Sequence, residues 1–323
     1  MNLPRGFDDH LLRLLGARAF ASPPQRLNGG YWAAIYGFEL AGHHTLRGPL
    51  VLRVMPTSDE KCAREAAFQS AVARAGFPAP RVHLSGGRDD GFGFPYIVMQ
   101  RLGGSVLGVG SLWQLPALLG TTLADLHRLD TQGLPSVSLE FILSELSERA
   151  APLEDGSLRA ALDWLGRERP ATRRRVVCHG DFHPLNLLVE GGRVSGVLDW
   201  THAHLGEPEF DAAYASLMLR LWPLDRPWLP RRWLKGPLGG GAARAFLRAY
   251  RGELEPARFA WCEALHLVRI LVRVARARAG ITSPPLGPRH PWELAARDAS
   301  RALQARSGIA IRLPEPCALP LAS

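Results

Sequence analysis

The sequence predicts an α+β fold of two lobes: a small antiparallel β-sheet lobe over residues 1–102, and a mainly helical lobe over residues 103–323. Val, Ile, Tyr and Trp are frequent in segments of the first hundred residues, and such segments favour strands. From about residue 111 onward, apolar residues recur at helical spacing instead. Gly103 and Gly104 interrupt the pattern between these two regions and indicate a hinge.

The first elements are expected to be one helix and three strands. Residues 8–16 have an amphipathic pattern that predicts a short helix, with Asp8 or Asp9 as its N-cap. Residues 26–40 are expected to form a twisted hairpin, and residues 49–55 a third strand beside it. These segments would begin an antiparallel sheet.

A helix and two more strands are expected to complete the first lobe. Residues 58–76 begin with a serine and end with a glycine, which are favoured at the start and just past the end of a helix. Strands are predicted at 81–85 and 94–100.

The second lobe is expected to be helical except for a strand-rich insert at residues 175–199. Pro256 suits the first turn of a long helix that reaches about residue 279. Other helices are predicted near 111–129, 138–150 and 157–169. The proline-rich residues 223–237 and 284–291 are expected to be loops, and the last ten residues a loose tail.

Composition narrows the class of protein. The chain has 323 residues, of which 46% are hydrophobic, so it can bury a sizeable core. Its net charge of +9 favours anionic partners such as nucleotides. No stretch interleaves basic and aromatic residues as a nucleic-acid groove would, so nucleic acid is not an expected partner.

Cysteine spacing and hydropathy indicate a cytoplasmic protein. Cys62, Cys178, Cys262 and Cys317 stand far apart without a CxxC pair, which is typical of reduced thiols. Arginines interrupt the longest apolar run, and the N-terminus does not resemble a signal peptide. No membrane partner is therefore expected, and the oligomeric state is left open.

The stretch VVCHGDFHPLNLLVEGGRVSGVLDW, residues 176–200, carries the strongest functional signal. It alternates strand, polar loop, strand, tight turn and strand. Phosphoryl transfer requires a carboxylate near the attacking hydroxyl and oxygen ligands for Mg²⁺. Asp181 and Asn186 have the spacing of the base and the metal ligand in a protein-kinase catalytic loop. Asp199 is expected to return to the same place at the end of the next hairpin.

CHGDFHPLNLLV and VLDW resemble the signature of the aminoglycoside phosphotransferase and choline kinase-like family, which has a protein-kinase-like fold. Residues 118–130 (LLGTTLADLHRLD) and 206–215 (GEPEFDAAYA) are similar to helices of that family. The resemblance covers roughly residues 24–280. It implies a kinase that uses ATP or GTP with Mg²⁺ to phosphorylate a hydroxyl of a small molecule.

The resemblance also implies roles for individual residues. Asp181 would be the catalytic base, and Asn186 and Asp199 would bind Mg²⁺. His179 and Asp211 would brace the catalytic loop. For His183, a role in the site and a structural role are both open.

The nucleotide-binding residues are expected in the first lobe. Arg53 occupies the position of the kinase β3 lysine, and it keeps the positive charge. Glu65 is the expected partner of Arg53 on the following helix, and Glu60 is the second choice.

Two further segments are candidates for contact with the nucleotide. Asn28, Gly29 and Gly30 form a reduced glycine-rich loop that could approach the phosphates. Gln100 and Leu102 belong to the linker expected to bind adenine through its backbone.

Two other interpretations remain. His179, Asp181 and His183 alternate at period two and, with His202 and His204, could form the metal site of a hydrolase. This would leave the spacing of Asp181 and Asn186 unexplained. The arginine at position 53 and the thin glycine loop also fit a nucleotide-binding pseudokinase or regulatory protein without turnover.

The acceptor is expected to be a neutral or anionic hydroxyl compound. Residues 202–323 contain 18 basic and 10 acidic residues, which argues against a polycationic substrate. A protein-kinase activity is not expected, because no DFG or APE motif follows the hairpin.

Overall fold

The computed structural model describes residues 6–27, 33–106, 114–135, 137–221, 231–281 and 290–315, without the side chains of 231–237 and 291. These residues form two compact units. Unit 1 comprises the described residues within Met1–Trp113, Leu129–Ser136 and His179–His204. Unit 2 comprises those within Gln114–Arg128, Val137–Cys178 and Leu205–Ser323. The predicted domain boundary at residue 102 stays a prediction.

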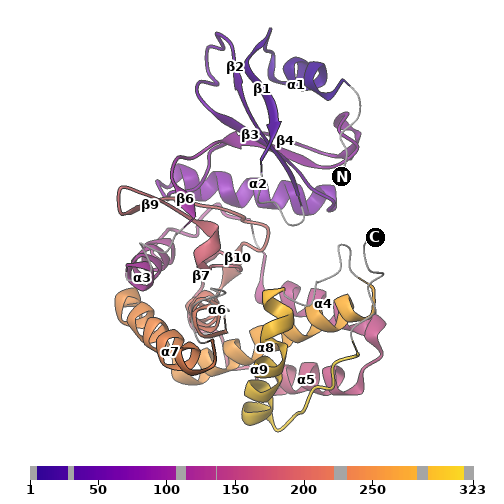
Figure 1. Ribbon diagram of the computed structural model, residues 1–323, viewed down its shortest axis with the longest axis vertical. Coiled ribbons are helices and arrows are strands. Elements are labelled where there is room, and N and C mark those ends of the chain that lie inside the picture. Colours follow the sequence, from indigo (N-terminus) through magenta and orange to yellow (C-terminus); the bar gives the residue numbers. More distant parts are fainter. Residues whose placement is uncertain are drawn as a thin grey trace. The chain divides into compact units, whose positions relative to one another are not determined.

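Unit 1 contains a five-stranded antiparallel sheet (Figure 1). Its strands are β1 Phe20–Arg26, β2 Ala34–Leu40, β3 Leu50–Val54, β4 Val82–Gly86 and β5 Tyr96–Gln100, in the spatial order β1-β2-β3-β5-β4. Leu52, Val54 and Val98 of the central strands are fully buried, in a core that also includes residues of α1 (Phe7–Leu15).

The first strand was only partly predicted. The sequence placed a hairpin within residues 26–40, whereas β1 covers Phe20–Arg26 and ends where that segment begins. Pro23 and Pro24 lie inside β1. Because proline donates no hydrogen bond to a neighbouring strand, the sequence did not predict a strand here. The strand is possible because it is an edge strand, and its register with β2 is irregular at two places.

The two helices of unit 1 differ in how they begin. Ser58 caps α2 (Asp59–Arg74) by accepting a hydrogen bond from the Lys61 N–H, as predicted. The predicted cap of α1 by Asp8 or Asp9 is wrong. Gly6 is the N-cap, in a left-handed conformation, and both aspartates lie in the first helical turn, where acidic residues favour the helix dipole.

A second, three-stranded sheet in unit 1 carries the catalytic-loop candidates. It consists of β6 Ser105–Val106, β8 Leu187–Glu190 and β9 Arg193–Val197, in the order β6-β8-β9. The 3-10 helix η4 (Pro184–Asn186) immediately precedes β8. The predicted hairpin over this stretch is therefore present.

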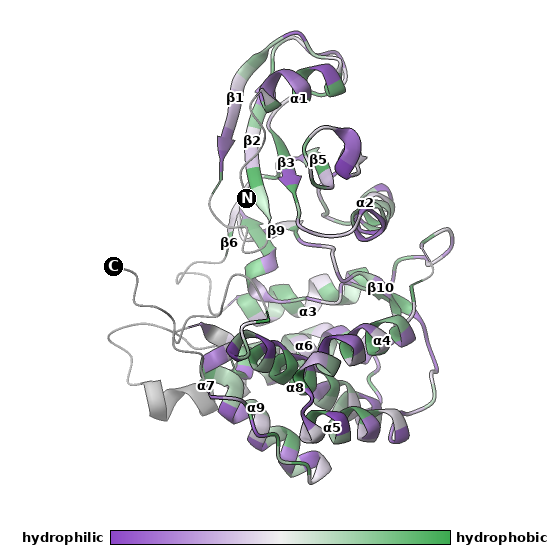
Figure 2. Cartoon of the chain, turned by 90° about the vertical axis from the view of Figure 1, so that its right-hand side faces the viewer, coloured by the Kyte–Doolittle hydropathy of each residue, from purple (hydrophilic) through white to green (hydrophobic). Residues whose placement is uncertain are grey.

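Unit 2 is mainly helical. Its helices are α3 Leu115–Leu126, α4 Leu139–Ala150, α5 Gly156–Arg167, α6 Pro208–Leu221, α7 Arg231–Tyr250, α8 Pro256–Arg278 and α9 Pro291–Ser307. β7 (Val176–Cys178) pairs with β10 (His204–Gly206). Hydrophobic residues gather where α6 and α8 pack (Figure 2). The sheet and the helical unit confirm the predicted α+β, protein-kinase-like fold class.

The prediction of a loop over residues 223–237 is wrong from residue 231 onward, because α7 begins at Arg231. Pro237 and the four glycines of α7 lower its local preference for a helix. Tertiary packing outweighs that preference, since α7 packs on α3 and α6. A Cβ on Gly120 of α3 would lie 2.5 Å from the Phe246 carbonyl oxygen, so glycine is required for this close approach.

Residues 222–230, most of the predicted loop at 284–291, and the end of the predicted tail lie outside the described residues. Among the helices that the structure describes, none combines the length and the apolar character needed to cross a bilayer.

Candidate functional site

A sharp turn at Gly180 begins the polar loop. Gly180 has φ +80°, and a Cβ at this position would collide with the carbonyl of His202. Only glycine adopts such a conformation without strain and leaves room for that carbonyl. The turn places His179 and Asp181 on either side of it.

His179 is fully buried and links the loop to the end of the next hairpin. Its Nε2 lies 2.9 Å from the Leu198 carbonyl oxygen, and its Nδ1 accepts a hydrogen bond from the Asp181 N–H at 3.3 Å. Nε2 must therefore carry the proton. The ring also packs against Trp200, with 4.7 Å between centroids. Both nitrogens are committed to backbone groups, so His179 has the contacts of a bracing residue.

His183 lies beside the Asp181 carboxylate. Its Nδ1 accepts from the Leu185 N–H at 3.2 Å, which places the proton on Nε2. Nε2 lies 3.4 Å from Asp181 Oδ2. The structure thus brings His183 into the polar loop, facing the candidate base.

Asn186 is held in a defined orientation. Its Nδ2 donates to the Asp181 backbone carbonyl at 3.0 Å and also lies 3.3 Å from His183 Nε2. Because a carbonyl oxygen faces Nδ2, the amide cannot be turned over without losing this bond, and the side-chain oxygen points elsewhere. The Asn186 backbone carbonyl accepts from the Leu198 N–H at 2.8 Å, which ties the loop to the residue before Asp199.

Asp199 has φ +64°, a left-handed conformation that is uncommon for a residue other than glycine. Such strained positions occur at functional sites, where the surrounding contacts hold them in place. Here the contacts that hold Asp199 come from Arg53 in β3 and from Thr201.

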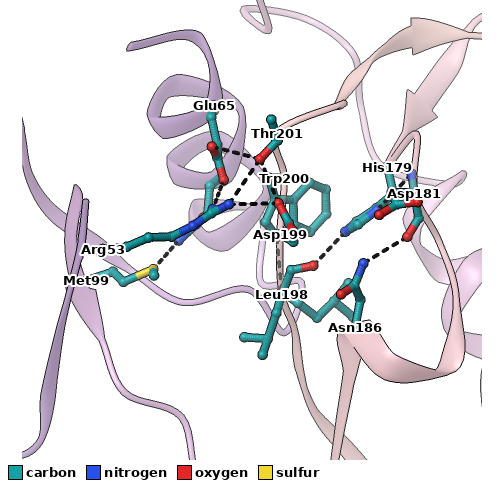
Figure 3. A network of polar contacts seen from close by, with 12 residues as sticks. Arg53, Glu65, Met99, His179, Asp181, Asn186, Leu198, Asp199, Trp200 and Thr201 are labelled. Carbon is teal, nitrogen blue, oxygen red and sulfur yellow. Dashed lines mark hydrogen bonds and ion pairs between the residues drawn. The ribbon is translucent and has the colours of Figure 1, made fainter. Parts of the chain in front are cut away.

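Arg53 of β3 links Asp199 to α2 (Figure 3). Its Nη1 forms an ion pair with Glu65, and its Nη2 lies 3.0 Å from Asp199 Oδ1. The predicted pairing of Arg53 with Glu65, rather than with Glu60, is therefore present in the structure. The binding of a nucleotide by these residues stays a prediction.

The charges in this cluster stabilise one another. Burial alone would lower the pKa of Arg53, but the carboxylates of Glu65 and Asp199 outweigh it and raise that pKa. Burial would raise the pKa of Asp199, but the Arg53 charge and a hydrogen bond from Thr201 outweigh it and lower that pKa. Burial raises the pKa of Glu65, against the effect of Arg53. Arg53 and Asp199 are both charged at neutral pH.

Thr201 is a member of this cluster that the sequence did not identify. Its hydroxyl lies 2.6 Å from Asp199 Oδ1 and 3.1 Å from Glu65 Oε2. A hydroxyl two residues after Asp199 was a signal in the sequence. Its importance depends on Arg53 and Glu65, which are 148 and 136 residues away.

The remaining candidates for nucleotide contact are only partly described. Asn28, Gly29 and Gly30 lie outside the described residues. The Gln100 N–H donates to the Arg81 carbonyl at 2.8 Å and is therefore already used. Leu102 packs over Gly196, where a Cβ would lie 2.6 Å from Leu102 Cδ1.

The oxygen atoms around Asp199 and Asn186 suit Mg²⁺. Mg²⁺ prefers one or two carboxylates and other oxygen ligands. Asp199 offers a carboxylate whose side chain is 42% exposed, and Asn186 offers an amide oxygen. The donor chemistry therefore fits a divalent cation at this place.

The alternative metal site of a hydrolase is not supported. Among the described residues, the one His, Cys, Asp and Glu grouping with suitable ligand distances is His127, Cys178 and Asp211. His179 has both nitrogens bonded to backbone groups, so it has no lone pair left for a metal. The alternative grouping of His179, Asp181 and His183 as metal ligands is therefore not supported.

The buried group in unit 2 is also a poor metal site. His127 Nδ1 lies 2.7 Å from the Tyr250 hydroxyl, and its Nε2 lies 3.5 Å from Asp211 Oδ2. Burial raises the pKa of the Cys178 thiol, which donates to the Glu207 carbonyl. Each of the three side chains therefore already has a hydrogen-bond partner within unit 2. This group has the contacts of a core polar network, and the bracing of the loop by Asp211 stays a prediction.

The family model of the phosphotransferase enzyme family matches residues 41–262, and the chain belongs to this family. The match confirms the resemblance carried by the polar loop. The class of protein that this match defines is the phosphotransferase enzyme family.

Particular relatives cover parts of the chain. An aminoglycoside 3'-phosphotransferase of Streptomyces fradiae is 31% identical over 134 residues, 41% of this chain and 42% of its own length. Acyl-CoA dehydrogenase family member 10 of Mus musculus is 28% identical over 193 residues, 52% of this chain. The chain spans only 18% of the length of that mouse protein.

Solved structures share the fold. A thermostable mutant of aminoglycoside phosphotransferase APH(4)-Ia has a TM-score of 0.63 at 19% identity, covering 93% of this chain and 99% of its own. A variant of that mutant in ternary complex with AMP-PNP and hygromycin B has a TM-score of 0.56 at 18% identity, covering 93% and 95%.

Proposed function

We propose that the protein transfers the γ-phosphoryl group of ATP or GTP to a hydroxyl of a small molecule. The observation that carries this proposal is the set of hydrogen bonds that joins the loop of Asp181 and Asn186 to the strand end before Asp199. A base and two oxygen ligands connected in this way are what phosphoryl transfer requires.

Asp181 is the proposed general base. Its Oδ2 lies 3.4 Å from Nε2 of His183, the nitrogen that carries the proton, so the imidazole can hold the carboxylate in place. An ionised carboxylate can accept the proton of an incoming hydroxyl. His183 and His179 then act as positioning residues, the first on the carboxylate and the second on the backbone of the loop.

Asn186 and Asp199 are the proposed ligands of Mg²⁺. When bound, this ion would neutralise charge on the nucleotide phosphates. Arg53, held by Glu65, is proposed to contact those phosphates in place of the kinase lysine, because guanidinium retains the charge and binds phosphate well. Leu102 is proposed as the adenine contact, and Asn28, Gly29 and Gly30 as the phosphate loop.

The acceptor is proposed to be a neutral or anionic hydroxyl compound. The related structure with hygromycin B makes an aminoglycoside the natural comparison. Residues 202–323, with 18 basic and 10 acidic residues, favour a less cationic ligand. Turnover measured with aminoglycosides and with neutral or anionic hydroxyl compounds decides between these two classes of acceptor.

The test is release of nucleoside diphosphate from ATP and from GTP. The acceptor panel contains aminoglycosides, neutral sugars, amino alcohols, hydroxy acids and macrolides, each with and without Mg²⁺. Asp181→Asn is expected to lower kcat by about 100- to 10,000-fold on the accepted compound. Asp89→Asn, an exposed aspartate of the same unit, is the matched control and is expected to keep wild-type activity. Equal turnover by wild type and Asp181→Asn would exclude the proposed base.

A nucleotide-binding protein without turnover is the second candidate. The observation that favours it is Arg53 at the lysine position, where its two nitrogens already contact Glu65 and Asp199. Mg²⁺-dependent nucleotide binding with no product from any acceptor would support this candidate and exclude the kinase.

A further inference from the structure

The hydroxyl of Thr201 contacts three charged side chains. Asp199 Oδ1 lies at 2.6 Å, Glu65 Oε2 at 3.1 Å and Arg53 Nη2 at 3.2 Å. These partners come from β3, from α2 and from the turn after β9 (Figure 3). Like Arg53, Thr201 thus contacts every other member of the cluster formed by Arg53, Glu65, Asp199 and Thr201.

The Thr201 hydroxyl has one proton, so it can donate to only one of its partners at a time. Arg53 has no acceptor, so its Nη2 donates and Thr201 accepts. The single hydroxyl proton is then left for one of two carboxylates. The shorter contact is the one to Asp199, which makes it the stronger hydrogen bond.

This arrangement divides the carboxylate of Asp199 into two unlike oxygens. Oδ1 receives hydrogen bonds from Arg53 Nη2 and from Thr201. Oδ2 receives none from the residues that the structure describes, and the side chain is 42% exposed. Oδ1 is thus anchored to the protein, and Oδ2 is left for a partner from outside the described residues.

We propose that Thr201 is a positioning residue that anchors Asp199 through Oδ1, so that Oδ2 is presented to the divalent cation of a bound nucleotide. This inference rests on the proposed function. Residues that orient a metal ligand by hydrogen bonding affect metal affinity although they never touch the metal. The Thr201 hydroxyl also keeps Arg53 from being the sole partner of Asp199 Oδ1.

Thr201→Val removes the hydroxyl and keeps the shape of the side chain, while Thr201→Ser keeps the hydroxyl. Thr201→Ala removes the hydroxyl without the β-branch, and thermal denaturation checks that each variant folds. Thr57→Val is the matched control, because Thr57 is also half-buried in unit 1 and its side chain makes no hydrogen bond within the described residues.

The readout is binding, not turnover. The dissociation constant of AMP-PNP is measured by calorimetry with Mg²⁺ and again with EDTA, and their ratio is the gain in affinity from the metal. Thr201→Val and Thr201→Ala are expected to reduce this gain by about 10- to 100-fold, with little change in the EDTA value. Thr201→Ser and Thr57→Val are expected to stay near the wild-type gain.

Each other outcome is decisive. An unchanged gain in Thr201→Val would overturn the proposal for Thr201 and leave the proposed function intact. An equal loss of affinity with Mg²⁺ and with EDTA would assign Thr201 a purely structural role and overturn it as well. If the wild-type protein shows no Mg²⁺-dependent binding of AMP-PNP, the proposed function fails and this inference fails with it.

Discussion

Arg53 and Glu65 form an ion pair between β3 and α2, with side chains that are only 12% and 1% exposed. Burial of two charges is costly unless each keeps its partner. The pair therefore holds β3 and α2 in a fixed arrangement. The loss of either member should lower the stability of unit 1.

The two charges should be strongly coupled in stability. Arg53→Met leaves the buried Glu65 without its partner, and Glu65→Leu leaves Arg53 with Asp199 alone; each is expected to cost up to about 3–5 kcal/mol of unfolding free energy. The double variant is expected to lose less than the sum of the two, because neither charge of the buried pair remains and only the partly exposed Asp199 loses a partner. Urea denaturation of the four proteins measures this. Additive losses would contradict the coupling.

Gly180→Ala is expected to damage the catalytic loop. The added Cβ meets the His202 carbonyl and also strains a residue with φ +80°, so the expected cost is about 2–5 kcal/mol. Gly191→Ala is the control, because Gly191 has φ +57° with open space around it, and its expected cost is about 1–2 kcal/mol. Equal losses of stability in the two variants would show that the His202 contact is not limiting.

Three thiols are expected to be unreactive in the folded protein. Cys62, Cys178 and Cys262 are buried, and burial raises the pKa of Cys62 to about 12. The thiolate is the reactive form, so little of it is present at pH 8. Ellman's reagent, applied to a Cys317→Ser variant, is expected to label no thiol until guanidinium is added. Rapid labelling without denaturant would contradict this burial.

Glu140 is expected to make the free energy of unfolding depend on pH in the acidic range. Hydrogen bonds from Ser138 and from its own backbone, with help from Arg169, lower its pKa from 4.5 to about 2. A lowered pKa in the folded state stabilises the protein above pH 4.5, and this contribution is lost as pH falls toward 2. Glu140→Gln is therefore expected to show a smaller drop in Tm than wild type between pH 6 and pH 3.5.

Glu168→Gln is the control for that measurement, since Glu168 is an exposed glutamate at the end of α5 in the same unit. It is expected to follow the wild-type pH dependence. Identical curves for all three proteins would show that Glu140 makes no linked contribution.

Local signals predicted most of the helices. Ser58 caps α2 and Pro256 opens α8, and both effects act within one helical turn. β1 and the start of α7 were missed for the opposite reason. Prolines and glycines lower the local preference, and only an edge position or packing on neighbouring helices compensates for it.

The residues of the candidate site likewise differ in whether local sequence or distant contacts identify them. Asp181, Asn186 and Asp199 lie within a short stretch whose spacing can be recognised in the sequence. Thr201 carried a weaker signal, a hydroxyl two residues after Asp199, because its partners Arg53 and Glu65 come from elements more than a hundred residues earlier. The sequence identified the residues proposed for chemistry, and only the folded chain showed that the Thr201 hydroxyl contacts Asp199.

The prolines of β1 have a consequence for self-association. An unpaired strand edge can recruit the edge of another molecule and begin aggregation. β1 is an edge of its sheet, and because the N–H groups of successive strand residues point to opposite sides, one of the adjacent Pro23 and Pro24 removes a donor from the free side. This border of the sheet is consequently a poor template for intermolecular β-pairing, which favours a chain that stays dispersed at high concentration.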